Sequence, residues 1–382
     1  MKVLLIALIA MLSINNAFSQ TNFNEKSEII DSLMLNHLVH KGKRPIYNIL
    51  LYAKNEKTGY EYFGGQGSIG KRNEKRVEAD YQYRIASITK TVVATIVLQL
   101  EEEGKLNVND KAYSYLDGLD FLNFDEFLIL NNTSYAKDIR IKDLLQHTSG
   151  IADIFTDKKS RFNISVFLNK KRQFTPEGLV DIYYKYNLNK EPNNKPGESM
   201  HYSDMNYMLL GFIIEQVTKQ KLPQVIRDRI IEKLGMNNTY FEYYEKEYGN
   251  GKRVDTYLNR INMTKKINSS YEWAGGGLVS TTKDVAIFIE ALFNNELFQN
   301  SSTLDKMIDF SDNKKYGLHY GMGISLYKFN DKLFYGHGGY YGSLLIHEPI
   351  DNITLSINVG QVKLPSNNKI FMKNIMDVIM NE

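Results

Sequence analysis

Strand-like segments occur near both ends of this chain, and a long, mostly helical stretch separates them. Runs of β-like composition lie at residues 47–53 and 59–63, and others return only after residue 320. Between about residues 111 and 253 the chain reads mostly as helix and loop. Strands from the two ends therefore have to pair across the fold. This predicts an α/β (α+β) fold: an antiparallel sheet built from both chain ends and flanked by helices, with a mostly helical inserted domain.

The same pattern gives the expected domain boundaries and elements. Residues 20–110 and 254–382 are expected to form the sheet domain, and residues 111–253 the helical inserted domain. The late strands are expected at 320–329, 332–335, 343–347 and 353–359. Apolar periodicity predicts helices at 25–40, 89–103, 141–146, 176–186, 204–218, 223–234, 282–294 and 367–380. The glycine-rich residues 64–67 predict a turn.

Residues 1–19 have the composition of a signal peptide. Lys2 supplies a positive charge, residues 3–14 are almost entirely apolar, and Ala17 and Ser19 are small residues where a signal peptidase prefers them. The apolar run is too short to span a bilayer. We therefore expect an exported protein, periplasmic or secreted, without a transmembrane anchor after signal cleavage. The chain has no cysteine, which excludes disulfides and thiolate metal sites.

Charge and histidine placement exclude further classes of function. The formal net charge is only +3, and no run of Lys and Arg stands out, so no nucleic-acid partner is expected. None of the seven histidines belongs to an HExxH or similar motif, so we expect neither a metal nor a cofactor. Neither the oligomeric state nor the type of cell envelope follows from the sequence.

Ser87 and Lys90 are the first candidate catalytic residues. Ser-x-x-Lys on a helix places the hydroxyl and the amine one turn apart on one face, where Lys can assist Ser as a nucleophile. The chain holds seven such patterns, and most have a simpler explanation; at Ser280, for example, Thr281 and Asp284 resemble a helix cap. The first turn after Ser87 carries Lys90 and no acid, which opposes the helix dipole. Catalysis and simple capping both remain open on this pattern alone.

Two later segments carry further polar candidates. Tyr202 lies in a turn before an apolar helix that Asp204 can cap, although a packed aromatic side chain would look the same. His337 is surrounded by glycines, which lets backbone pass close to a ligand, although a hairpin turn is the alternative. Residues 146–150 (Gln-His-Thr-Ser-Gly) end a helix, where a polar loop held by its own hydroxyls is equally consistent.

Taken in order, these elements resemble the serine β-lactamase and penicillin-binding protein family. The motifs are Ser87-x-x-Lys90, residues 146–150, Tyr202-Ser-Asp204 and His337-Gly-Gly339. The similarity extends over about residues 47–359, and the nearest branch contains class C β-lactamases, DD-peptidases, related esterases and D-aminopeptidases. Four ordered motifs are far more specific than any one of them, and together they favour catalysis at Ser87 over simple capping.

The resemblance implies a role for each motif residue. Ser87 would attack a carbonyl and form an acyl-enzyme, with Lys90 and Tyr202 sharing the proton transfers. The backbone N–H groups of Ser87 and Tyr340 would form the oxyanion hole. His337 stands where relatives carry Lys or His and is counted with the catalytic residues. The substrate-binding residues would be Asp204, Gly338 and Gly339.

Two departures from the family pattern bear on the substrate. Asp204 stands where many relatives have Asn, and a carboxylate near Lys90 would favour its ammonium form, so Tyr202 would carry more of the proton transfer. Gly338 replaces a Thr whose hydroxyl helps to hold a substrate carboxylate. We therefore expect a serine hydrolase of small esters or amides, including D-amino-acid peptides, that acts through an acyl-serine. The alternatives are a β-lactamase or D-alanyl-D-alanine carboxypeptidase proper, and a catalytically weak penicillin-binding or sensor protein.

Overall fold

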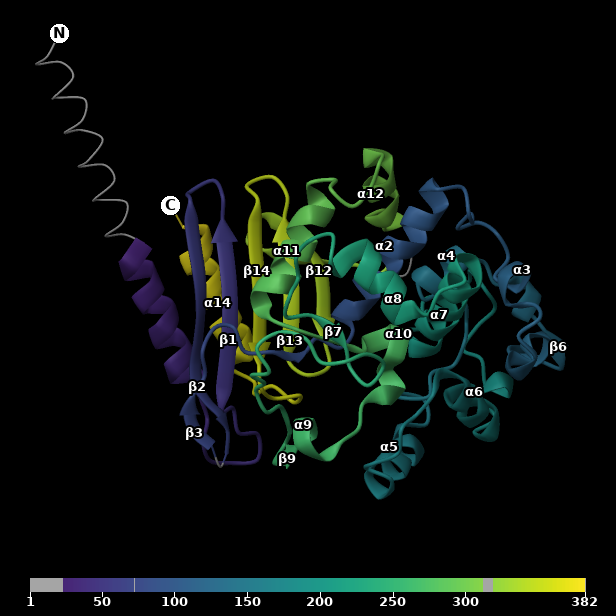
Figure 1. The fold of residues 1–382 in the computed structure, drawn as a ribbon, viewed down its shortest axis with the longest axis horizontal. Helices are drawn as coiled ribbons and strands as arrows, with labels where there is room; N and C mark the ends of the chain where they lie inside the picture. The colour runs from purple at the N-terminus through teal and green to yellow at the C-terminus, as the bar shows by residue number, and fades with distance from the viewer. Residues whose placement is uncertain (1–22, 72, 312–318, 382) are drawn as a thin grey trace, which may run out of the picture.

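A seven-stranded antiparallel sheet forms the centre of the structure, a computed structural model that describes residues 23–71, 73–311 and 319–381 (Figure 1). The strand order is β11-β12-β13-β14-β1-β2-β3. At its middle, β1 (Asn48–Asn55) pairs with β14 (Ile353–Val359), so the two ends of the chain meet there. The other strands are β2 (Tyr60–Gly70), β3 (Asn73–Arg76), β11 (Ser325–Phe329), β12 (Lys332–Gly339) and β13 (Ser343–Glu348). The predicted fold class is confirmed; the predicted signal peptide lies outside the described residues.

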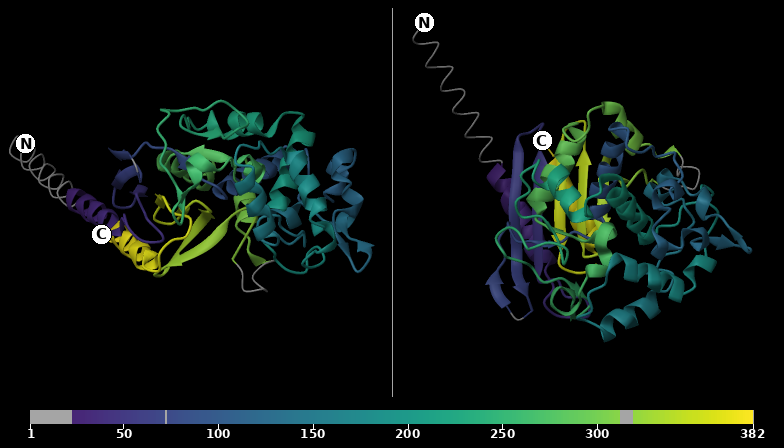
Figure 2. Two further views of the ribbon diagram at one scale, coloured as in Figure 1. Left: turned by 90° about the horizontal axis from the view of Figure 1, so that it is seen from below. Right: turned by 45° about the vertical axis from the view of Figure 1, so that its right-hand side comes forward.

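The sheet separates two apolar layers. Successive side chains of β1 point to opposite faces, so Ile49 and Leu51 join one layer while Leu50 joins the other. The smaller layer lies beneath the N-terminal helix, residues 23–37, and α14 (Asn368–Met380). These two helices lie side by side against one face of the sheet (Figure 2), and Lys26 Nζ donates to the backbone oxygen of Asn381 at 2.6 Å.

The opposite face of the sheet carries α2 and α11. α11 (Thr282–Phe293) packs across β13, β14 and β1. α2 (Ile88–Glu102) contacts β12 on one side, and α7 (Asp204–Thr218) and α10 (Trp273–Gly276) on the other. α2 lies between the sheet and the helical region, so its N-terminus stands where the two meet (Figure 1).

The middle of the chain is helical, as predicted. α7 has the predicted limits, and α6 (Pro176–Lys185) ends one residue early. The segment predicted as one helix at 223–234 is α8 (Leu222–Ile226) followed by a π-helix, Arg227–Ile231. No helix of the described chain is both long and apolar enough to cross a membrane. The remaining α-helices are α3 (Tyr113–Leu116), α4 (Ile141–Leu145), α5 (Lys159–Leu168), α9 (Met263–Lys266) and α12 (Ser301–Met307).

Short strands complete the fold outside the main sheet. β4 (Tyr83–Arg84), which leads into Ser87 and α2, pairs with β10 (Leu278–Ser280), and β10 also pairs with β7 (Tyr240–Phe241). Two small hairpins are β5 (Ile129–Leu130) with β6 (Thr133–Ser134), and β8 (Tyr257–Leu258) with β9 (Ile261–Asn262).

Two local predictions are wrong. The glycine-rich residues 64–67 are not a turn, because β2 continues through them to Gly70. Here glycine allows close packing: a β-carbon on Gly64 would lie 2.2 Å from Tyr62 Oη, and one on Gly65 would lie 2.9 Å from Leu50 Cδ2. The strand predicted at 332–335 continues to Gly339, so His337 is part of β12 and not of a hairpin turn.

Candidate active site

Ser87 stands at the N-terminus of α2, directly after β4. The residue before it, Ala86, has a φ of 49°, an unfavourable conformation for a residue with a side chain. The Ser87 side chain makes no capping hydrogen bond, and the first turn of α2 contains no acidic residue. Simple capping therefore does not account for Ser87, and its hydroxyl is free for another role.

Lys90 lies beneath Ser87 and has no exposed surface. Its Nζ donates to Ser87 Oγ at 3.1 Å, to Asp204 Oδ1 at 2.5 Å and to the backbone oxygen of Gly275 at 2.7 Å. Burial on its own lowers the pKa of Lys90, but the Asp204 carboxylate outweighs it, and the pKa is raised above its ordinary value. Lys90 is therefore an ammonium group, as expected from an Asp at position 204.

Tyr202 faces the same point from the start of α7. Its ring centroid lies 5.0 Å from Lys90 Nζ, and its phenol oxygen is buried without a hydrogen bond of ordinary geometry to the described residues. Burial raises the pKa of Tyr202 to about 12, while the Lys90 charge and the Ser87 hydroxyl act in the opposite direction. The phenol is thus neutral, and its oxygen lies close enough to Ser87 and Lys90 to interact with both.

Residues 146–150 support the Tyr202 segment from behind. The His147 ring packs against Tyr202, with 4.1 Å between the centroids. His147 Nδ1 accepts hydrogen bonds from the Ser203 backbone at 3.2 Å and from Asn206 Nδ2 at 3.1 Å, and Ser149 Oγ donates to Asn206 Oδ1 at 2.6 Å. Burial, followed by the Lys90 charge, holds the pKa of His147 well below its ordinary value. Residues 146–150 are held by α7 as well as by their own hydroxyls, and they fix the position of the Tyr202-Ser-Asp204 motif.

His337 has both ring nitrogens engaged within the protein. Nδ1 donates to the backbone oxygen of Gly338 at 2.6 Å, so Nε2 accepts from the Tyr320 hydroxyl at 3.0 Å. Burial and the nearby Lys90 charge lower the pKa of His337 to about 3. His337 is therefore neutral at physiological pH and supplies no positive charge to a substrate.

The two glycines after His337 have different surroundings. A β-carbon on Gly338 would have Tyr327 Oη as its nearest neighbour, at 3.5 Å, which is ordinary contact. A β-carbon on Gly339 would lie 2.3 Å from the backbone oxygen of Ile85 and 2.1 Å from Ser343 Oγ. Glycine at position 339 lets the end of β12 lie against the backbone that leads to Ser87.

The expected oxyanion groups lie at this contact. Ser343 Oγ also donates to the Ile85 backbone oxygen, at 3.0 Å, which holds the β12–β13 turn against that backbone. Within the described residues, neither Ser87 N–H nor Tyr340 N–H donates to a backbone oxygen. Both donors are therefore free for a substrate oxygen, although their role as an oxyanion hole stays a prediction.

A cavity of about 430 Å³ opens beside Ser87. It is lined by the predicted residues Tyr202, Asp204, His337 and Gly338, whereas Gly339 only packs behind it. Its remaining wall is largely apolar and aromatic, formed by Phe155, Phe162, Val166, Phe167, Leu258, Met263, Ile267, Tyr271, Tyr327 and Tyr340. No Lys or Arg of the described chain lines it.

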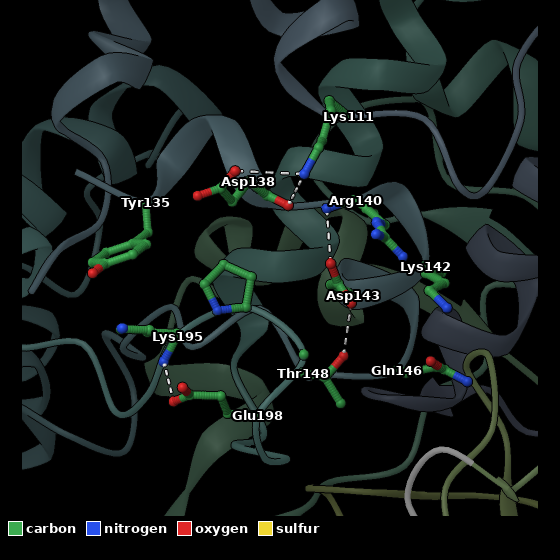
Figure 3. Close-up of a pocket in the computed structure, with 12 residues that line it drawn as sticks. Lys111, Tyr135, Asp138, Arg140, Lys142, Asp143, Gln146, Thr148, Lys195 and Glu198 are labelled. Atoms are coloured by element: carbon green, nitrogen blue, oxygen red, sulfur yellow. Dashed lines mark hydrogen bonds and ion pairs between the residues drawn. The ribbon is translucent and has the colours of Figure 1, made fainter. Parts of the chain in front are cut away.

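A second cavity, of about 460 Å³, lies in the helical region and holds none of the nucleophile residues (Figure 3). Its charged groups are largely paired. Lys111 Nζ donates to the backbone oxygen of Asp138 at 2.8 Å, and Thr148 Oγ1 donates to Asp143 at 3.2 Å. We therefore take the cavity at Ser87 as the active site.

Sequence reasoning missed several residues of this cavity. Glu272 lines it and belongs to no motif, and Tyr327 of β11 lines it as well, while Tyr320 acts through its hydrogen bond to His337. Helix α5 supplies Phe162, Val166 and Phe167 and was not predicted as a separate helix. The only sequence signal was their aromatic and apolar character, which ordinary core residues share.

The chain is similar to a known protein family over most of its length. Residues 33–369 match the family model described as Beta-lactamase. Protein flp of Staphylococcus aureus (strain MW2) is 33% identical over 221 residues, which covers 57% of this chain and 39% of flp; the chain thus spans well under half the length of that relative.

Two solved structures share the fold over most of both chains. A D-stereospecific amidohydrolase from Streptomyces sp. is 24% identical with a TM-score of 0.73, covering 92% of this chain and 98% of the other. EstCE1, a hydrolase with promiscuous acyltransferase activity, is 17% identical with a TM-score of 0.71, covering 95% of this chain and 100% of the other.

Proposed function

We propose that this chain, which belongs to the β-lactamase family of serine hydrolases, hydrolyses small esters or amides through an acyl-Ser87 intermediate. The observation that carries the proposal is the placement of Ser87. Its hydroxyl caps no helix, receives a hydrogen bond from the buried Lys90 ammonium at 3.1 Å, and opens onto a largely apolar cavity. The two structural neighbours, an amidohydrolase and a hydrolase with acyltransferase activity, are consistent with acyl transfer.

Acylation would use Tyr202 as a proton relay. As Ser87 Oγ bonds to the carbonyl carbon, its proton passes to the Tyr202 oxygen. Tyr202 gives its own proton to the leaving nitrogen or oxygen as that bond breaks, so Tyr202 is neutral before and after the step. Lys90 stays an ammonium group and stabilises the negative charge that develops on Oγ. The carbonyl oxygen would accept hydrogen bonds from the N–H groups of Ser87 and Tyr340.

Deacylation would use the same groups in reverse. A water molecule adds to the acyl carbon while one of its protons passes to Tyr202, and Tyr202 returns a proton to Ser87 Oγ as the ester bond breaks. The products are the carboxylic acid and free enzyme. Because the relay needs no ionised tyrosine, it is compatible with a Tyr202 pKa of about 12.

The cavity favours substrates without a free carboxylate. His337 is neutral with both nitrogens engaged, Gly338 has no hydroxyl, and no Lys or Arg of the described chain lines the cavity. A β-lactam or a D-Ala-D-Ala peptide would bring a carboxylate beside Asp204 without a cation to bind it. Esters and amides that are uncharged at this position avoid that cost, which makes a β-lactamase or carboxypeptidase the weaker alternative.

The test is a substrate panel together with acyl-enzyme detection. Purified protein is incubated with a fluorophosphonate probe and read by intact mass, and kcat/KM is measured for short-chain p-nitrophenyl esters, simple amides and penicillins. We expect one adduct on the wild type and none on Ser87→Ala. Ser366→Ala is the matched control, because Ser366 and Lys369 have the same spacing and are both exposed, at the start of α14. Absence of both adduct and turnover would favour a binding protein, and faster turnover of penicillins than of esters would favour a β-lactamase.

We also propose that the protein is exported to the periplasm or secreted. The support is residues 1–19 alone, whose composition is that of a signal peptide. Terminal sequencing of protein from the cell envelope or the medium is expected to give Gln20 as the first residue. An unprocessed Met1 in the cytoplasmic fraction would contradict export.

A further inference from the structure

We propose that Glu272 binds the α-ammonium group of the substrate, and that the preferred substrates are amides or esters of α-amino acids with a free amino group and an apolar side chain. This inference rests on the proposed function, since it names the substrate class of the same site. It assigns a role to an acidic residue that the acyl-transfer steps leave unused.

The backbone around Glu272 is held in an unusual conformation. Glu272 ends a short 3₁₀-helix, Ser270–Glu272, directly before α10. The next residue, Trp273, has a φ of 29°, which is rare for a large side chain. Trp273 is buried and packs against Phe212, with 4.9 Å between the ring centroids. Burial of this tryptophan fixes the turn and thereby the direction of Glu272 into the cavity.

The Glu272 carboxylate lies near the backbone that leads to Ser87. Its Oε2 is 2.9 Å from the position that a β-carbon on Gly276 would occupy, and the carbonyl carbon of Ala86, bonded to Ser87, is 3.5 Å from the same position. A β-carbon on the preceding glycine, Gly275, would lie 2.7 Å from Asp204 Oδ1 and 3.4 Å from Lys90 Nζ. The two carboxylates therefore approach Ser87 along adjacent glycines of α10.

The two carboxylates differ in their partners. Asp204 is paired with Lys90, whereas Glu272 Oε1 accepts a hydrogen bond from Tyr341 and forms no ion pair with the described residues. Arg84, the cation whose charge lowers the pKa of Glu272, is bound to Glu242 at 2.7 Å and lies over the Tyr341 ring, 5.5 Å from its centroid. Oε2 has no hydrogen-bond donor among the described residues and belongs to a side chain that lines the cavity.

The surroundings favour a cation next to Glu272. Burial raises the pKa of Glu272 to about 8, and the negative charges of Asp204 and Glu242 raise it further. The hydrogen bond from Tyr341 and the charge of Arg84 lower it, but by less than burial raises it. A carboxylate in this position has lost water without gaining a charged partner, which is costly. A substrate ammonium would supply that partner through a charge-assisted hydrogen bond.

The remaining walls of the cavity fit the rest of an amino acid. The amino group of an α-amino acid is two bonds from its carbonyl carbon, so with the carbonyl at Ser87 the ammonium is short enough to remain near Glu272. Beyond Glu272, Phe155, Phe162 and Tyr271 form an aromatic wall, with Tyr271 centroids 5.5 and 5.2 Å from those of Phe155 and Phe162. An apolar side chain would lie against this wall.

The experiment compares two substrates that differ only in the amino group. Phenylalanine p-nitroanilide, in both enantiomers, is compared with 3-phenylpropanoyl p-nitroanilide, which lacks the amine. Glu272→Gln keeps an oxygen for Tyr341 and removes the carboxyl group that would ionise beside a bound ammonium. For the preferred enantiomer we expect kcat/KM to fall about tenfold to a hundredfold, with less than a twofold change for the substrate without the amine. Glu296→Gln, at an exposed position, is the matched control.

The outcomes separate the two proposals. An equal loss on both substrates would mean that Glu272 only maintains the turn, and no loss on either would also overturn the inference. If the wild type hydrolyses neither anilide and none of the esters and amides of the substrate panel, the proposed function fails, and Glu272 is still tested by calorimetry with phenylalaninamide. The Ser87→Ala variant is then expected to bind this amide at least tenfold more tightly than Ser87→Ala/Glu272→Gln, and equal affinities would overturn the inference.

Discussion

Lys90 Nζ lies 2.5 Å from Asp204 Oδ1, and the Lys90 side chain has no exposed surface. The ion pair is thus largely removed from water, directly beneath the nucleophile. Where relatives carry Asn, Lys90 would lose this partner and burial alone would act on it. The pair therefore decides whether Lys90 acts on Ser87 as a base or as a cation, and the raised pKa of Lys90 favours the cation.

Asp204→Asn is expected to move the alkaline limb of the pH–rate profile to lower pH. Asp204 raises the pKa of Lys90, so without it the ammonium loses its proton at lower pH and its stabilising charge is lost. The measurement is kcat/KM for a short-chain ester between pH 5 and about 10.5, near the ordinary Lys pKa. An acidic limb that moves down instead would show that neutral Lys90 is the working base.

Ser87→Ala is expected to reduce turnover by about 10⁶, and Lys90→Met by a similar factor, because the two residues act as a unit. The double variant should be no slower than either single variant. Additive losses would count against the pairing seen at 3.1 Å. Circular dichroism on each variant shows whether the fold is kept.

Tyr202→Phe is expected to slow acylation by about 10² to 10⁴, since it removes the hydroxyl that relays the proton and nothing else. Tyr257→Phe is the matched control. Its hydroxyl accepts a hydrogen bond from the Lys71 backbone at 3.0 Å and does not line the cavity, so activity should stay within about twofold. A Tyr202→Phe enzyme with normal burst kinetics would show that another group carries the proton.

Gly338→Thr and Gly339→Ala are expected to behave differently although they are neighbours. A β-carbon at 338 meets only ordinary contacts, so the Thr variant should fold and gain about tenfold to a hundredfold on substrates with a free carboxylate. A β-carbon at 339 would meet the Ile85 backbone at 2.3 Å, so the Ala variant should be less stable by about 1–3 kcal/mol and less active. Thermal melts and penicillin hydrolysis test both, and a stable, active Gly339→Ala would contradict this account.

The contribution of buried His347 to the free energy of unfolding is expected to fall as the pH drops below about 6.5. Burial lowers the pKa of His347 to about 4, so between pH 6.5 and 4 the unfolded chain binds a proton that the folded chain does not. This makes stability decrease with falling pH, by up to about 1.4 kcal/mol per pH unit for each such histidine. In urea titrations, His347→Gln should reduce this slope, whereas His319→Gln, at an exposed position, should not.

Local signals in the sequence were enough to predict most of the helices and strands and to propose Ser87 as the nucleophile. The limits of α7 were predictable because Asp204 is an acidic residue in its first turn and its apolar residues recur at helical spacing. The expected capping by the Asp204 side chain is wrong, since the N-cap is Ser203 and no side chain caps the helix. Ser87 and Lys90 could be paired from a single helical turn. The glycines at 64–67 were misread, because glycine serves turns and close packing alike, and only Tyr62 and Leu50 distinguish the two uses.

The charge states and the substrate cavity could not be predicted in this way. The pKa of His337 falls to about 3 because Lys90 and the surrounding burial come from distant parts of the chain. Glu272 adjoins Trp273 in sequence, but its partner Tyr341 is 69 residues away. Such interactions form only in the folded chain, and the local hydrophobic periodicity of the sequence does not reveal them.

The pairing of β1 with β14 also sets the order of events during synthesis. The strand that begins at Asn48 can gain this neighbour only after residue 359 has been made, so most of the polypeptide exists before the sheet can close. Ser87 is produced early, but the β12 segment that lies against its backbone comes about 250 residues later, and contacts at such separation form slowly. A nascent chain therefore carries the nucleophile long before it has an active site, and hydrolysis begins only when the last strands are in place.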